Sequence, residues 1–135
     1  MGRAMTSSHP LRRATSLPAR LPLALRWAVV AAGIAVLFYL ALSPSDSLPS
    51  VTLADKIQHA LGFFVLALVY GLMFPRRRAA VAAGVAGLGI AVEVLQALMP
   101  FGRHAEAGDL IADAVGIIIG LIAVRLLAGP AKLPT

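Results

Sequence analysis

Residues 79–99 read AAVAAGVAGLGIAVEVLQALM, and Glu93 is the one charged side chain in this run. A helix needs about 20 consecutive apolar residues to cross the hydrocarbon core of a bilayer. The run follows Arg76, Arg77 and Arg78 and stops before Pro100, which is typical of a helix that ends there. The sequence therefore predicts a membrane-spanning helix over these residues.

Three further apolar runs have comparable length, at residues 21–42, 57–74 and 110–128. Proline follows each of them directly or within two residues, and proline cannot continue a helix. Membrane strands would need runs of about 10 residues with alternating polarity, and no such alternation is present. We therefore predict an all-α protein, a bundle of four transmembrane helices.

The composition agrees with this prediction. Hydrophobic residues make up 59% of the 135 residues and charged residues 13%, against about 25% in soluble domains. The chain has no cysteine, which excludes disulfides and thiolate metal sites. It also has no phosphate-binding loop, dinucleotide fingerprint or nucleophile elbow. We predict a basic, disordered tail over residues 1–22, a membrane domain over 23–128 and a short tail over 129–135.

The charged residues predict the orientation, because short cytoplasmic loops are enriched in lysine and arginine. With four crossings, one face of the membrane carries Arg3, Arg12, Arg13, Arg20, Arg76, Arg77, Arg78 and Lys132. The other side holds every acidic residue: Asp46, Asp55, Glu93, Glu106, Asp109 and Asp113. We predict cytoplasmic N- and C-termini in a bacterial plasma membrane. The net charge of +6 then reflects topology and contact with anionic lipids, not nucleic-acid binding.

Polar side chains gather near the outer ends of three predicted helices. Within each helix they are three or four residues apart and so share a face. The pairs are Asp55 and His59, Glu93 and Gln96, and Asp109 and Asp113. Lys56 and Arg103 lie at the same predicted depth, so the eight side chains form one candidate binding site.

Glu93 is the deepest of these residues. A charged side chain at the centre of a spanning helix costs about 2.5–3.5 kcal/mol on insertion scales, so such residues usually have a partner and a function. The candidate partners are Lys56, His59 and Arg103. In the alternative interpretation Arg103 pairs with Glu93 or Asp55 only to hold helices together.

Several other polar residues have simpler interpretations. We expect Gln96 to form a hydrogen bond between helices and Asp109 to cap the N-terminus of the last helix. Glu106 has the character of a solvated loop residue. Gly116 and Gly120 allow close helix packing, either within the chain or between chains, and the oligomeric state stays open.

No cofactor is predicted. A divalent metal held by Asp55, His59, Glu93 and Asp113 is the alternative that this set would allow, because helical bundles can supply such ligands. The chain has neither an HExxH nor an ExxH motif that would favour this alternative.

These motifs resemble those of the VanZ-like family of small bacterial membrane proteins, over about residues 30–127. The similarity lies in Asp55-Lys56-x-x-His59-x-x-x-Phe63, Glu93-x-x-Gln96, Arg103 and Asp109-x-x-x-Asp113-x-x-Gly116-x-x-x-Gly120. Asp113 departs from the pattern, in which asparagine is more frequent. The resemblance implies an accessory protein of the cell envelope, from a family named after a protein linked to teicoplanin resistance.

Three functions follow as hypotheses. The first is a module that binds a lipid head group or a lipid-linked envelope precursor at the outer leaflet, with Arg103 and Lys56 holding phosphate or carboxylate. The second is an enzyme acting on such a lipid, with Glu93 and His59 as acid and base. The third is a small transporter or proton pathway.

Overall fold

The computed structural model describes residues 17–43, 53–99 and 106–128, and every element in these ranges is helical. The elements are α2 (Leu17–Arg20), α3 (Leu23–Leu42), α4 (Leu53–Met73), α5 (Arg78–Leu98) and α6 (Ala107–Ala128). Four of them, α3 to α6, are long and apolar enough to cross a membrane. The predicted all-α fold with four spanning helices is confirmed in this respect.

Two helices begin about one turn earlier than predicted. Helix α4 begins at Leu53 and not at residue 57, and α6 begins at Ala107 and not at residue 110. Asp109 is therefore the third residue of α6, and the prediction that it caps this helix was wrong. Apolar runs mark only the part of a helix that faces hydrocarbon, whereas polar residues can continue the same helix for another turn in the interface.

The predicted basic tail is only partly described. Helix α2 lies within it, while residues 1–16 and the C-terminal residues 129–135 lie outside the described ranges.

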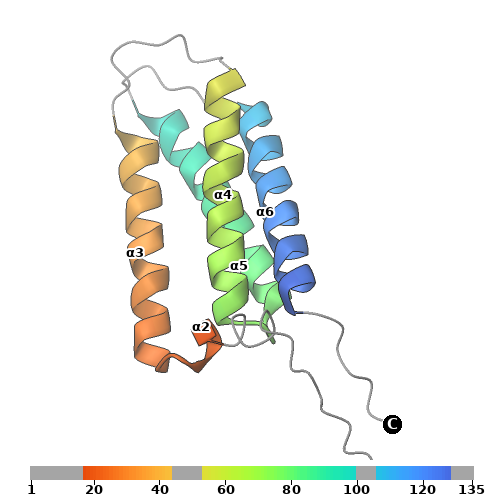
Figure 1. Cartoon of the computed structure of the whole chain (residues 1–135). Coiled ribbons are helices and arrows are strands. Elements are labelled where there is room, and N and C mark those ends of the chain that lie inside the picture. The colour runs from red at the N-terminus through yellow and green to blue at the C-terminus, as the bar shows by residue number, and fades with distance from the viewer. Residues whose placement is uncertain (1–16, 44–52, 100–105, 129–135) are drawn as a thin grey trace, which may run out of the picture.

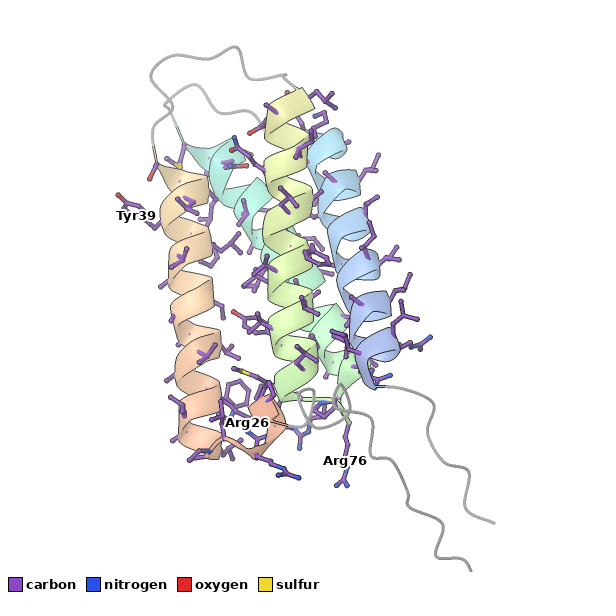
Figure 2. The ribbon with its side chains drawn as sticks, in the orientation of Figure 1. Arg26, Tyr39 and Arg76 are labelled. Carbon is purple, nitrogen blue, oxygen red and sulfur yellow. The ribbon has the colours of Figure 1, made fainter. Side chains whose placement is uncertain are left out.

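The four long helices alternate in direction, so each end of the bundle collects two helix starts and two helix ends (Figure 1). Where α4 and α6 begin, the described carboxylates gather; we call this the polar end. At the opposite end α3 and α5 begin and α4 and α6 finish. We call it the arginine end, after Arg26, Arg76, Arg77, Arg78 and Arg125. Figure 2 shows Arg26 and Arg76 there, while Tyr39 points away from α3 toward the polar end.

Helices α4 and α6 pack most closely, and two glycines of α6 explain why. A Cβ atom at Gly116 would collide with the backbone of Ala60 and Phe64 in α4. One at Gly120 would collide with the backbone oxygen of Phe64 and with the side chain of Ala67. The glycines therefore serve packing within the chain, since only a missing side chain lets two helix backbones approach so far.

Helix α3 is the peripheral member of the bundle, and none of its residues is buried. Side-chain hydrogen bonds attach it to its neighbours at three depths. The Tyr70 hydroxyl donates to the Val30 carbonyl at 2.8 Å, and the Gln96 amide donates to the Ala41 carbonyl at 2.9 Å. At the arginine end, Arg26 donates to the Met73 carbonyl at 3.1 Å. These bonds matter because hydrophobic burial drives little association between helices in lipid.

The core lies among α4, α5 and α6. It consists of Phe63, Leu66, Ala67, Tyr70, Val85 and Ile117. Large apolar side chains on the outward faces stay exposed, among them Ile118, Ile122 and Leu126. Such an apolar exterior suits a lipid environment, in which it costs nothing.

Candidate functional site

A histidine and an aspartate join α4 to α6 at the polar end. His59 Nδ1 lies 2.9 Å from Asp113 Oδ1, and both side chains are largely buried. Asp113 has no role as a capping or loop residue, because it lies nearly two turns inside α6, beside α5. A Cβ atom at Gly89 of α5 would meet its second carboxylate oxygen. The carboxylate therefore fixes the orientation of the imidazole, as in carboxylate–histidine pairs at many catalytic and metal sites.

Lys56 forms the second link between α4 and α6. Its Nζ lies 3.0 Å from Glu106 Oε2 and 3.2 Å from Asp109 Oδ1. The lysine stem lies directly over Gly108, where a Cβ atom would meet Nζ. The ammonium group of Lys56 thus already forms ion pairs with two carboxylates, so it is poorly placed to bind a phosphate at the same time.

Glu93 is 5% exposed and makes an unexpected contact. Its Oε2 accepts a hydrogen bond of 2.9 Å from the backbone N–H of Glu106, directly before α6. Its Oε1 is buried and has no hydrogen-bond partner among the described residues, as is also true of Asp113 Oδ2. Of the predicted partners of Glu93, neither Lys56 nor His59 bonds to it.

Gln96 has the predicted role of a hydrogen bonder between helices. It is 2% exposed and donates to the carbonyl of Ala41, in the last turn of α3. Most carbonyls in the last turn of a helix receive no hydrogen bond from an N–H group of the same helix, so Gln96 also satisfies the end of α3.

Arg103, the predicted anion-binding residue, lies outside the described residues, as does His104. The other seven candidates, namely Asp55, Lys56, His59, Glu93, Gln96, Asp109 and Asp113, all lie at the polar end of the bundle. Asp55 and His59 line a cavity, whereas the other five form contacts between helices or with the start of α6.

The cavity has a volume of about 390 Å³ and lies between α3, α4 and α5. Its polar lining is Asp55, Gln58 and His59, and its apolar lining includes Leu37, Leu40, Leu61, Phe63 and Val92. Pockets of about 300–1,000 Å³ are typical of small-molecule sites. One wall can therefore take a polar group while the others accommodate hydrocarbon.

Two residues at this end were missed by sequence analysis. Glu106 is a half-buried partner of Lys56 and not a solvated loop residue. Its spacing of three from Asp109 was the available signal, because both face α4 from the start of α6. Gln58 lines the cavity and is likewise three residues from Asp55.

Three residues could hold a metal ion. Potential ligand atoms of Asp55, His59 and Asp109 lie within 4.8 Å of one another, and none of the three side chains is fully exposed. This set differs from the one considered in the sequence, since Asp109 takes the place of Glu93 and Asp113. Lys56 would compete with an ion for Asp109, because its ammonium group already lies 3.2 Å from that carboxylate.

The pair formed by His59 and Asp113 is suited to proton transfer. A histidine backed by a buried carboxylate can accept or donate a proton through its other nitrogen, which faces away from that carboxylate. Because His59 also lines the cavity, a molecule bound there would lie beside it.

Comparison with known protein families matches residues 24–128 to the VanZ/LLP1 family. No match is found among curated proteins or among solved structures. The matched range includes the four spanning helices, apart from Leu23 at the start of α3, and every described residue of the polar end. The chain is therefore a multi-pass membrane protein that belongs to the VanZ/LLP1 family.

Proposed function

We propose that this protein binds the head group of a membrane lipid, or of a lipid-linked precursor of the cell envelope, in the cavity at its polar end. The observation that carries the proposal is the amphipathic lining of that cavity. Asp55, Gln58 and His59 offer hydrogen bonds on one side, and leucines of α3 offer an apolar wall on the other. A lipid needs both environments within one site.

The cavity would lie on the extracytoplasmic side. The arginine end carries six arginines in the described residues, with Arg20 of α2 included, and no described acidic residue, which suits the cytoplasmic face. The head group would therefore come from the outer leaflet of the bacterial plasma membrane, and both termini would be cytoplasmic.

The polar lining favours a head group rich in hydrogen-bond donors, such as hydroxyl or ammonium groups. A carboxylate accepts hydrogen bonds, and the Gln58 amide and the His59 imidazole can do so as well. Lys56 is already held by Glu106 and Asp109. Contact with phosphate is therefore proposed for Arg103, whose guanidinium group suits an anion with several oxygens.

A glycine in the cavity wall provides the sharpest test. A Cβ atom at Gly62 would meet nothing within 4 Å, so Gly62→Leu fills the cavity without displacing a neighbour. Gly87 has equally open surroundings and does not line this cavity, so Gly87→Leu is the matched control.

The measurement is the lipid that copurifies with the protein in mild detergent, identified by mass spectrometry. We expect one lipid class to be enriched in the wild type and in Gly87→Leu, and to be lost in Gly62→Leu and in Arg103→Ala. Equal recovery of every lipid class from the wild type and Gly62→Leu would exclude the cavity as the binding site.

A second candidate function rests on the pair formed by His59 and Asp113. An oriented imidazole beside a lipid head group could act as general base or acid on that group, with Glu93 as a second candidate for proton transfer. Turnover of the copurified lipid by purified protein should then vanish in His59→Gln and in Glu93→Gln while the lipid still binds. Full turnover in His59→Gln would exclude this chemistry.

A further inference from the structure

The arginine end contains a second cavity, separate from the one at the polar end. It has a volume of about 290 Å³ and lies between α3, α4 and α5. Its lining is almost wholly apolar and includes Val30, Ile34, Val81, Val85 and Leu88. Trp27, Phe74 and Arg77 form the part nearest the arginine end, where the rings of Trp27 and Phe74 lie 5.3 Å apart.

The length of this cavity matches one leaflet of a bilayer. Along α5 it extends from Arg77 to Leu88, which corresponds to about 16 Å at 1.5 Å per residue. Half of the hydrocarbon core of a bilayer is about 15 Å thick. A lipid acyl chain that enters beside Arg77 and follows the apolar lining would therefore extend across one leaflet.

The arginines at the mouth of this cavity, beside Arg77, have no acidic partner among the residues that the structure describes. All six acidic residues are known from the sequence, and the five that the structure describes lie at the polar end. No carboxylate of the described residues therefore balances the charge of Arg26, Arg77 and Arg78, and an anion from the surrounding membrane could do so.

Two further details favour an anion at this place. The Nε atoms of Arg26 and Arg78 are buried and have no hydrogen-bond partner among the described residues. Helix α5 also begins here without a side-chain cap, so the N–H groups of its first turn remain available. Backbone N–H groups and the helix dipole at such an end attract phosphate.

We propose that this cavity is a binding site for an anionic phospholipid of the leaflet that surrounds the arginine end. One acyl chain occupies the apolar cavity, and the phosphate lies between Arg77 and the start of α5. Arg26 holds the mouth in place, because it donates to the Met73 carbonyl and its guanidinium carbon lies 5.4 Å from the centre of the Phe74 ring. The site does not depend on the function proposed for the polar end.

Trp27 reports directly on this site, because it lines the cavity and is the only tryptophan of the chain. The full chain is reconstituted in phosphatidylcholine bilayers that contain phosphatidylglycerol. The acyl chains of one lipid or the other are brominated, and bromine quenches tryptophan fluorescence on contact. The ratio of quenching by the two brominated lipids at equal mole fraction measures the preference for the anionic lipid.

Three variants separate a site from general attraction to arginines. Gly84→Leu fills the cavity, since a Cβ atom at Gly84 would meet nothing within 4 Å, yet it leaves every arginine in place. Gly87→Leu adds the same side chain outside the cavity. Arg77→Gln removes the charge at the mouth; its side chain is exposed, so the variant should fold.

We expect the wild type and Gly87→Leu to prefer the anionic lipid. Arg77→Gln should reduce this preference about fivefold, as a basic residue near anionic lipid contributes about that factor. Gly84→Leu should abolish it. Equal quenching by the two lipids in the wild type would overturn the proposal. So would an unchanged preference in Gly84→Leu, because the arginines would then attract only the lipids around the bundle.

Discussion

His59 and Asp113 are 54 residues apart in the sequence, yet Nδ1 of the histidine lies 2.9 Å from a carboxylate oxygen of the aspartate. The contact joins α4 to α6 just below the polar end, at a depth where few polar groups find water. Side chains at this depth interact mainly with each other, so the pair has a structural as well as a chemical consequence.

Asp113→Ala should destabilise the protein. The variant leaves the buried imidazole without its partner, and hydrogen bonds to charged groups contribute about 1.5–3 kcal/mol. Asp113→Asn should cost less, because the amide keeps an oxygen that accepts a hydrogen bond from Nδ1. The free energy of unfolding in detergent micelles measures both effects. An alanine variant as stable as the wild type would contradict this role of the pair.

Gly116→Leu should separate α4 from α6. Its Cβ atom alone would collide with the backbone of Ala60 and Phe64, which cannot move aside as a flexible side chain could. Overpacking of this kind costs about 1–3 kcal/mol, and more where backbone must shift. Thermal unfolding in detergent should show a lowered Tm, whereas Gly87→Leu, in open surroundings, should unfold near the wild-type temperature.

Lys56→Met should also lower the Tm, because it leaves Glu106 and Asp109 as neighbouring negative charges without their shared cation. Removing one of these carboxylates should then restore part of the loss. We therefore expect the double variant Lys56→Met with Glu106→Gln to be more stable than Lys56→Met alone. Simple addition of the two single effects in a double-mutant cycle would show that the ion pair does not contribute.

Gln96→Leu should loosen α3 from the bundle. The leucine keeps the apolar volume but loses the hydrogen bond to the Ala41 carbonyl, worth about 0.6–1 kcal/mol between helices in a membrane. Because α3 has no buried residue, hydrogen exchange should rise mainly in α3 and little in α4 and α6. Gln58→Leu is the control for the substitution itself: Gln58 lines the polar-end cavity but makes no hydrogen bond to α3 among the described residues, so exchange in α3 should stay unchanged.

Periodicity and hydropathy were sufficient to find the four helices, because a spanning segment must satisfy its backbone within itself and present an apolar surface to lipid. They were less reliable at helix ends. The first turns of α4 and α6 contain Asp55 and Asp109, and polar residues at a helix start resemble a loop when only hydropathy is considered.

The candidate site was predictable as a set of residues but not as a set of contacts. The spacing of Asp109 and Asp113 placed both on one face of α6. In the structure Asp109 pairs with Lys56, and Asp113 pairs with His59. Glu93 was expected beside Lys56, His59 or Arg103; Arg103 lies outside the described residues, and the contact that the structure shows is the backbone N–H of Glu106. A backbone group leaves no signature in the sequence, which explains why this partner could not be found.

The sequence by itself determined that the chain is an α-helical membrane protein with charge divided between its two ends, because hydrophobic length and charge are local properties of each segment. The tertiary structure alone decided which carboxylate pairs with which cation, that α3 is peripheral, and that each end of the bundle has a cavity. These features depend on how the faces of separate helices meet. The packing of these faces is set by close contacts between helices, such as those of Gly116 with α4. The sequence of one helix alone cannot specify such a contact.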